Sequence, residues 1–386
     1  MSLYMFGGSS LAEVTFGRFR KAPKRAPIPL STDTHKVDVY IDVFDSSGSA
    51  NVVEASGATH SNAVLLNSSG QIIGKSIGPS TNHYCIGMSE CRKRIDDMIN
   101  DAKKEAGLSL DTPIDALGLS LSGCEQEASN KEIVNGLFEK YPNLSRKYVI
   151  ASDTDGSVAA ISNKGGVVCI AGTGSNTVLI NPDGNKVQCG GWGHILGDEG
   201  SAWKIAHTAI KYCFDQLDNF STSPHPIDRI WDETKAYFQM ETQADLLNAF
   251  YLNFDKAMIA KLCKRISELA DEGDELSKKI FRDAGRDLAK MISAVIGKAS
   301  NELTEREGGI QILCVGSVWL SWKLLKPGFI GYLNDNTSVT ELTLGKLTTS
   351  SAVGAALMAS DKLNIPINRD YSKNYEVFYI YQKAEK

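Results

Sequence analysis

The sequence predicts an α/β protein built from two lobes. The chain has 386 residues, which exceeds the size of a typical single domain. Apolar, β-branched runs bounded by turn residues alternate with helical patterns, and this alternation indicates an α/β sheet and not a β-sandwich. Each half of the chain begins with a similar unit, in which strands form a hairpin whose turn contains glycine. A ligand is therefore expected where the two lobes meet.

The first half opens with a predicted β-hairpin, because two apolar runs flank the turn Ser68-Ser69-Gly70. A helix is predicted next, since Ile95, Met98 and Ala102 recur at helical spacing and Gly107 provides a stop signal. The elements predicted for this half are, in order, strands 62–67 and 71–76, a helix at about 87–106, strand 116–122, helix 132–141 and strand 148–151.

The second half begins with a hydrophobic strand that runs into a glycine-rich turn, and Asn181-Pro182-Asp183-Gly184 then indicates a hairpin. Its predicted elements are strands 166–171 and 177–181, long helices around 201–217, 243–272 and 274–298, strand 312–315, helix 352–362 and an aromatic tail from Tyr371 to Tyr381. The expected boundaries are an N-terminal extension 1–45 without ordered structure, an N-terminal lobe 46–163, a C-terminal lobe 164–363, and a C-terminal segment 364–386 that packs back on the N-terminal lobe.

Composition excludes several classes of function. The net charge of -5 argues against a basic nucleic-acid surface. The 8 cysteines are scattered without a CxxC pair, so a zinc site or an iron–sulfur cluster has no support. Reduced thiols in the cytosol, most of them buried as small hydrophobic side chains, are the expected use of these cysteines. No apolar run approaches the roughly 20 residues that a membrane span needs.

The N-terminal extension has a composition that fits more than one interpretation. Its first 30 residues are rich in basic residues and serine, with Glu13 as the one acid, which is typical of an import signal. Prolines at positions 23, 27 and 29 oppose an amphipathic helix there. A disordered tail and a misassembled first exon are the alternatives.

A glycine-rich segment, 189–201, is the most informative stretch of the sequence. It contains five glycines in residues 190–201, together with Asp198 and Glu199 just before the start of a predicted helix. Because glycine loses much conformational freedom on folding and packs nothing, these glycines indicate a backbone that closely approaches a ligand. The alternative is a structural turn in which Asp198 caps the helix.

Two further glycine turns follow predicted strands. Gly172-Thr173-Gly174-Ser175-Asn176 offers consecutive amides and hydroxyls, which suit the binding of phosphate groups. Gly316-Ser317 follows strand 312–315 and adds a third loop of the same kind. Each turn alone is a weak signal, since glycine-rich turns after strands are common.

Asp153 is the candidate catalytic base, because it stands at the end of strand 148–151. Phosphoryl transfer to a sugar hydroxyl needs a carboxylate that orients this hydroxyl and accepts its proton. Asp155 is the alternative base, or else caps the following helix. The segment 78–83, which ends in Asn82 and His83, gathers short polar side chains that suit the recognition of sugar hydroxyl or amide groups, with a plain turn as the alternative.

These segments together resemble the eukaryotic N-acetylglucosamine kinases, of the sugar-kinase branch that includes the BadF/BadG-type ATPases. The resemblance runs from about Val52 to the C-terminus. The motifs that carry it are STNH at 80–83, LGLSLSG at 117–123, GTGSN at 172–176, NPDG at 181–184, GGWGHILGDEGSA at 190–202 and ILCVGSVW at 312–319.

The resemblance implies a two-lobed actin/hexokinase-like (ribonuclease H-like) ATPase fold with a central interlobe cleft. It implies that the protein phosphorylates N-acetylglucosamine at its 6-hydroxyl, that it uses ATP with Mg²⁺ and no resident metal, and that it forms a cytoplasmic homodimer. Asp153 matches the catalytic base. The positions that match the sugar site are Asn82, His83, Asp153, Ser175, Asn176, Gly191, Trp192, Gly193 and Asp198. The positions that match the ATP site are Gly57, Thr59, Thr173, Gly174, Ala260, Gly316, Ser317 and Ser321.

The first phosphate loop departs from the family pattern, which reads Glu-Gly-Gly-Gly-Thr followed by a basic residue. The matching stretch here is Ala55-Ser56-Gly57-Ala58-Thr59-His60, so two glycines have gained side chains. A second candidate for this loop is the run 43–49. The altered loop motivates an alternative function, a sugar-binding sensor that handles ATP poorly. A BadF-type activator ATPase is a third reading, which the scattered cysteines do not support.

Overall fold

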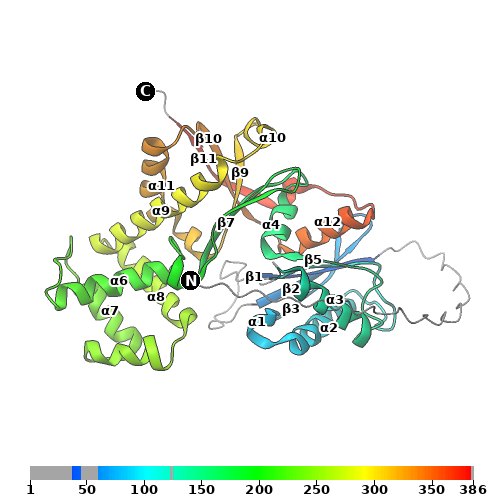
Figure 1. Ribbon diagram of the computed structural model, residues 1–386, viewed down its shortest axis with the longest axis horizontal. Helices are drawn as coiled ribbons and strands as arrows, with labels where there is room; N and C mark the ends of the chain where they lie inside the picture. The colour runs from blue at the N-terminus through cyan, green and yellow to red at the C-terminus, as the bar shows by residue number, and fades with distance from the viewer. Residues whose placement is uncertain (1–36, 45–59, 122–123, 125, 384–386) are drawn as a thin grey trace, which may run out of the picture. The chain divides into compact units, whose positions relative to one another are not determined.

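The computed structural model describes residues 37–44, 60–121, 124 and 126–383, and all of them belong to one compact unit, His35–Lys386. Two β-sheets with accompanying helices organise this unit (Figure 1). The prediction of an α/β protein is thus confirmed. Within the described ranges, no helix combines the length and the apolar character needed to cross a bilayer.

The first sheet has five strands in the order β3-β2-β1-β4-β5. Strands β1 to β3 form an antiparallel meander, and β4 and β5 extend the sheet in parallel with β1. The strands are β1 Val37–Phe44, β2 His60–Asn67, β3 Ile72–Pro79, β4 Leu117–Leu121 and β5 Tyr148–Ser152. The accompanying helices are α1 His83–Ile86, α2 Met88–Glu105 and α3 Glu127–Lys140. The predicted hairpin, helices and strands of this half are confirmed.

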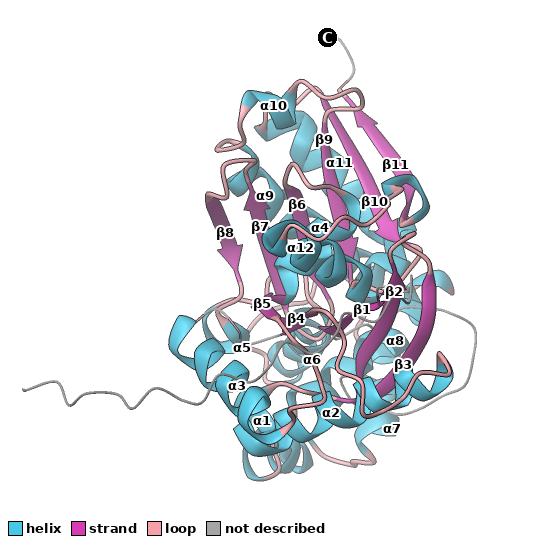
Figure 2. Cartoon of the chain, turned by 90° about the vertical axis from the view of Figure 1, so that its right-hand side faces the viewer, coloured by secondary structure: helices cyan, strands magenta, loops and turns pink. Residues whose placement is uncertain are grey.

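The second sheet repeats this topology and adds one strand. Its order is β11-β10-β9-β6-β7-β8, in which β6 to β8 form an antiparallel meander and β9 and β10 run parallel to β6 (Figure 2). The strands are β6 Gly166–Ala171, β7 Ser175–Ile180, β8 Lys186–Gly190, β9 Ile310–Val315, β10 Glu341–Leu347 and β11 Tyr375–Gln382. Without β11, the order and directions match those of the first sheet, so the chain contains two copies of one topology.

The helix that follows the fifth strand of each copy packs against the other sheet. After β5, the chain forms α4 Asp153–Ile161, whose Val158 packs in a buried cluster with β6, β7 and β9. After β10, it forms α12 Ala352–Leu363, which packs in a buried cluster with β2 and β5. The helices α4 and α12 also lie against each other (Figure 1). The two sheets are therefore joined through this helix pair.

The largest buried cluster joins the second sheet to α6, α8, α9 and α11. Helices α9 and α11 pack closely at Gly285. A Cβ at this position would lie 2.0 Å from the Leu325 carbonyl oxygen, so the contact requires a glycine. The remaining elements are α5 Gly193–Leu196, α6 Ala202–Leu217, α7 Asp228–Phe238, η1 Gln243–Asp245, η2 Asn248–Leu252, α8 Lys256–Asp271, α9 Glu275–Ile296, α10 Asn301–Thr304, η3 Ser317–Ser321, α11 Trp322–Asn336 and η4 Tyr371–Lys373.

The prediction of one long helix over 243–272 is wrong in its first part. The structure has two short turns, η1 and η2, before α8 begins at Lys256. Asp255 has an extended backbone, with φ -129° and ψ 102°, and its side chain accepts hydrogen bonds from the Ala257 and Met258 amides. This N-cap starts a new helix, because an aspartate that binds the first free amides favours a helix start over a helix interior.

Two expected domain boundaries also need correction. Strand β1, Val37–Phe44, pairs with β2 and β4, so it belongs to the first sheet and not to an N-terminal extension. Strand β11 pairs with β10, so the end of the segment 364–386 joins the second sheet. Its beginning does pack on the first sheet: Ile367 and Tyr371 join a buried cluster with β2 and β5, and the Asn368 amide donates to the Ser68 carbonyl oxygen.

None of the 8 cysteines, which all lie within the described ranges, forms a disulfide, and most are buried as expected. Burial raises the pKa of Cys91 to about 11 and that of Cys169, Cys213 and Cys263 to about 12. A thiol whose pKa lies above the pH stays protonated and unreactive, while Cys85 is exposed. We expect a thiol reagent at pH 8 to label about one cysteine rapidly in the native protein and all 8 after unfolding. Rapid labelling of three or more native thiols would contradict this packing.

Candidate functional site

The glycine-rich segment 189–201 leads from the end of β8 through α5 to the start of α6. Gly190 has φ 90° and Gly191 has φ 80°, values that side-chain-bearing residues rarely adopt. Gly190 also packs tightly, because a Cβ there would lie 2.6 Å from the Met291 methyl carbon. These glycines therefore shape the backbone of the segment, and its close approach to a ligand stays a prediction. The helix cap is not Asp198 but Ser201, whose hydroxyl accepts from the Lys204 amide at 3.1 Å.

Asp198 is a buried carboxylate with partners on both oxygens. It is 2% exposed and has φ 68°, which places a non-glycine residue in the left-handed region. Its Oδ1 accepts from the Ser175 amide at 3.0 Å, and its Oδ2 forms an ion pair with Lys256 Nζ at 2.6 Å. The carboxylate therefore joins the glycine-rich segment, the turn before β7 and the start of α8.

The turn between β6 and β7 packs directly on this carboxylate. A Cβ on Gly174 would lie 2.7 Å from Asp198 Oδ1, so this position leaves little room for a side chain. The turn is held by hydrogen bonds from the Gly172 amide to the Gly174 carbonyl and from the Ala202 amide to the Gly172 carbonyl. The turn 172–176 and the segment 189–201 are thus in direct contact.

Two buried polar atoms next to Asp198 have no hydrogen-bond partner among the described residues. They are the Ser175 hydroxyl oxygen and Asn176 Oδ1. Asn176 Oδ1 lies 3.0 Å from the position that a Cβ on Gly191 would occupy, so it faces the glycine-rich segment. Because most buried polar atoms in folded proteins are paired, these two atoms indicate a site for a polar ligand.

The third glycine loop lies against the second. Gly316 has φ 104°, and a Cβ there would lie 2.4 Å from the Ala171 carbonyl oxygen and 2.8 Å from the Gly172 nitrogen. Behind it, η3 is anchored by Trp319, whose indole N–H donates to the Cys169 carbonyl at 3.0 Å. The structure therefore brings Gly316 and Ser317 next to the turn that contains Thr173 and Gly174.

Asp153 is the first residue of α4, directly after β5, and it is half-buried. Asp155 has a structural role here, because its Oδ2 accepts from the Ser152 amide and hydroxyl at 3.1 and 2.8 Å. Its Oδ1 forms an ion pair with Lys186 on β8 at 2.5 Å. Of the two interpretations of Asp155, the helix cap is confirmed. The ion pair ties the start of α4 to the strand that leads into the segment 189–201.

The polar segment 78–83 connects β3 to α1. Asn82 caps α1, since its Oδ1 accepts from the Tyr84 amide at 3.0 Å. The Thr81 and Ser61 hydroxyl oxygens lie 3.2 Å apart, and Arg94 donates to the Ser80 carbonyl at 2.6 Å. His83 is 5% exposed, with its ring centroid 4.2 Å from that of Tyr84. These contacts give the segment a structural role as a connection and leave its role in sugar binding a prediction.

The other predicted residues differ in how the structure places them. Residues 45–59, which include Gly57 and Thr59, lie outside the described residues. Both candidates for the first phosphate loop, 43–49 and 55–60, fall largely within this range. Ala260 lies on α8 with its side chain in the hydrophobic core. Trp192, at the start of α5, is 69% exposed. Gly193 and Ser321 are partly buried, at the starts of α5 and α11.

Lys256 belongs to this site but was not predicted from the sequence. Its ion pair with Asp198 is set by tertiary packing, which no local pattern reveals. One signal was present: Lys256 follows Asp255, a good N-cap, and so stands in the first turn of a helix. A cation there opposes the helix dipole, and such a placement indicates a partner elsewhere in the fold.

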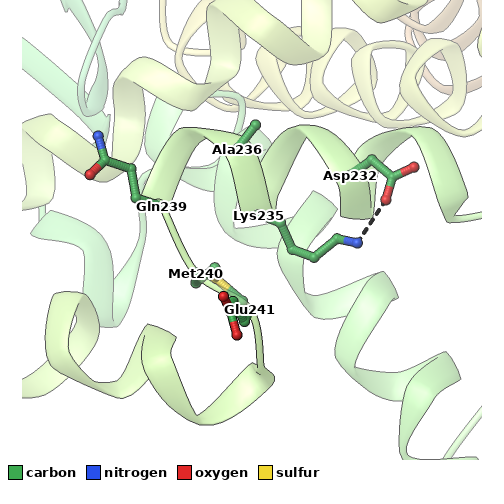
Figure 3. A pocket seen from close by; sticks show the side chains of 6 residues that line it. All are labelled: Asp232, Lys235, Ala236, Gln239, Met240 and Glu241. Atoms are coloured by element: carbon green, nitrogen blue, oxygen red, sulfur yellow. Dashed lines mark ion pairs between the residues drawn. The ribbon is translucent and has the colours of Figure 1, made fainter.

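A cavity at the end of α7 lies away from these residues. It has a volume of about 620 Å³ and is lined by Asp232, Lys235, Ala236, Gln239, Met240 and Glu241 (Figure 3). The Asp232 carboxylate and the Lys235 ammonium group are paired with each other at 2.8 Å. None of the predicted site residues lines this cavity, so it does not belong to the candidate site.

Comparisons with known proteins place this chain in an ATPase family and show that it is similar to sugar kinases. Residues 56–359 match the model of the BadF/BadG/BcrA/BcrD ATPase family. The chain is 26% identical over 284 residues to an N-acetylmuramic acid/N-acetylglucosamine kinase from Clostridium acetobutylicum, covering 73% of this chain and 88% of that protein. It is 25% identical over 263 residues to an N-acetyl-D-glucosamine kinase from Dictyostelium discoideum, covering 65% and 80%.

Solved structures share the fold. A candidate N-acetylglucosamine kinase from Chromobacterium violaceum matches with a TM-score of 0.61 and 21% identity, over 83% of this chain and 98% of that one. A second candidate, from Porphyromonas gingivalis, matches with a TM-score of 0.59 and 18% identity, over 85% and 99%. At these identities the matches establish the fold, which agrees with the repeated sheet topology described above.

Proposed function

Because the chain belongs to the BadF/BadG/BcrA/BcrD ATPase family, we propose that it transfers the γ-phosphoryl group of ATP to the 6-hydroxyl of N-acetylglucosamine. The observation that carries this proposal is the cluster around Asp198, in which Ser175 Oγ and Asn176 Oδ1 are buried without partners beside the turn 172–176. Such a cluster offers hydrogen bonds to a polyhydroxylated ligand next to amides that suit phosphate. The two kinase relatives named for N-acetylglucosamine support this choice of sugar.

The proposed reaction is an in-line displacement. Asp153 accepts the proton of the sugar 6-hydroxyl while the hydroxyl oxygen forms a bond to the γ-phosphorus. The bond between this phosphorus and the β–γ bridging oxygen breaks, and ADP leaves. The amides of the turn 172–176 and of Gly316-Ser317 would bind ATP phosphates, while Asp198, Ser175 and Asn176 would hold the sugar.

Magnesium would enter this site as part of the ATP substrate. Mg²⁺ in nucleotide enzymes is held by phosphates, water and one or two carboxylates. The Ser175 amide and the Lys256 ammonium group each contact one oxygen of Asp198. The residues therefore fit an ion that the phosphates bring, with Asp153 as the site carboxylate that would contact it.

An ADP-release assay tests the proposed function. We expect ATP-dependent turnover with N-acetylglucosamine that exceeds turnover with glucosamine, N-acetylmannosamine or N-acetylmuramic acid, and no ADP release above background without a sugar. Separate calorimetric titrations with ATP and with N-acetylglucosamine should both give binding. Sugar binding without ATP binding would instead identify a sugar sensor, the alternative that the altered loop 55–60 favours.

We further propose that the enzyme acts as a homodimer in the cytoplasm. The family resemblance supports both points, and 8 described cysteines that form no disulfide are compatible with a reducing compartment. Light scattering of the purified protein should give a mass near twice that of one chain.

A further inference from the structure

Lys256 occupies an unfavourable position in its own helix. It is the first residue of α8, where the helix dipole presents positive charge. Its side chain is 28% exposed and leaves bulk solvent to reach Asp198, with 2.6 Å between Nζ and Oδ2. A lysine at this helix position would normally extend into water, so its inward orientation needs a reason beyond the stability of α8.

Asp198 supplies that reason, because its buried carboxylate needs hydrogen-bond donors or a cation close by. The side chain of Asp198 is 3% exposed, and an unpaired carboxylate at such depth is strongly destabilising. The Ser175 amide and the Lys256 ammonium group each take one of its oxygens. Among the described side chains, Lys256 is the only cation in contact with it. Loss of this lysine would therefore leave one oxygen free to rotate away or to attract water.

The same ammonium group lies against the turn 172–176. A Cβ on Gly174 would lie 3.1 Å from Lys256 Nζ, so the lysine and the carboxylate both lie close to this glycine and leave little room for a side chain. Each carboxylate oxygen has two acceptor sites, and the described residues occupy one on each oxygen of Asp198. One acceptor site on each oxygen thus remains for a ligand hydroxyl, in an orientation that Lys256 and Ser175 determine.

We propose that Lys256 is a positioning residue for the acceptor sugar, acting through Asp198: its ammonium group holds the carboxylate in the orientation that accepts hydrogen bonds from the sugar. This inference rests on the proposed function and deepens it. It differs from a purely structural ion pair in one respect. A structural pair affects stability alone, whereas a positioning residue affects the affinity for sugar and leaves the affinity for ATP nearly unchanged.

The test measures binding of N-acetylglucosamine by calorimetry without ATP, and KM for both substrates. Lys256→Met removes the charge with little change in length, and we expect a sugar Kd at least 10-fold higher with a KM for ATP within threefold of the parent. Lys256→Arg keeps the charge and should recover sugar binding to within about threefold of the parent. The matched control is Lys261→Met on the same helix, where the lysine is exposed; its sugar Kd should not change.

A double variant separates action through Asp198 from direct contact with the sugar. Asp198→Asn combined with Lys256→Met removes both charges, so it leaves no unpaired buried charge even where Lys256→Met alone fails to fold. We expect it to bind sugar as weakly as Asp198→Asn alone, within about twofold. A further 10-fold loss in the double variant would overturn the inference, because Lys256 would then act without Asp198.

The outcomes also distinguish this inference from the proposed function. If the parent protein binds no N-acetylglucosamine, the proposed function itself is wrong. If the parent and the Lys256→Met variant bind the sugar equally well, only the proposed role of Lys256 is wrong. Equal losses in Lys256→Met and Lys256→Arg would likewise count against a role that depends on the charge.

Discussion

Replacing Asp153 with asparagine should lower kcat by about 10³-fold and leave the Kd for N-acetylglucosamine within about threefold of the parent value. Asparagine keeps the shape of the side chain but cannot accept the proton of the sugar hydroxyl. Asp153 begins α4 directly after β5, a position that holds it at the end of a buried strand. Initial rates of ADP release at saturating ATP and sugar, with calorimetry on the same preparation, check both parts of this expectation.

The matched control is Asp155→Asn, two residues further along the same helix. This change weakens the cap at Ser152 and the ion pair with Lys186, so the free energy of unfolding should fall by about 1 kcal/mol. We expect kcat to stay within about threefold, because Asp155 already has protein partners on both oxygens. Parental turnover by a purified Asp153→Asn protein would exclude Asp153 as the base. A 10³-fold loss in Asp155→Asn alone would assign the base to Asp155.

The fold was predictable where a local pattern coincides with burial. Strand β4 reads as an apolar run interrupted by one polar residue, Ser120, because it lies between β1 and β5 and is buried along its whole length. Strand β10 was missed because polar residues and Gly345 interrupt it, and its register with β11 shifts at that glycine. Helix α11 was missed because it contains Pro327, which usually ends a helix.

The site was predictable in its backbone and much less so in its charges. Glycines with positive φ, such as Gly190 and Gly316, leave a signal in the sequence because other residues rarely adopt these angles. The pairing of Asp198 with Lys256 leaves no such signal, since two remote segments meet only through tertiary packing. Strand β1 is a different case: its sequence VDVYIDVF places β-branched residues at alternate positions, so a local strand signal was present although the segment was assigned to the N-terminal extension.

Of the substitutions proposed for this protein, Gly354→Ala should lower the free energy of unfolding most. A Cβ at this position in α12 would lie 1.7 Å from the Gly156 carbonyl oxygen of α4 and 2.6 Å from the Ala160 nitrogen. These neighbours are backbone atoms, so no side chain can rotate away, and the two helices must move apart. We expect a loss of about 3 kcal/mol, which corresponds to a Tm about 4 °C lower for a protein of this size. Thermal unfolding followed by circular dichroism measures this change.

Gly331→Ala is the matched control, because Gly331 also lies inside a helix, α11, and a Cβ there would have no neighbour within 4 Å. This change should leave Tm unchanged or raise it, since alanine favours a helix over glycine by up to about 1 kcal/mol. A Gly354→Ala protein that melts within 1 °C of the parent would show that α4 and α12 are not in this close contact. These helices join the two sheets, and Asp153 stands at the start of α4. That result would therefore also contradict the contact that fixes the position of Asp153 relative to the second sheet.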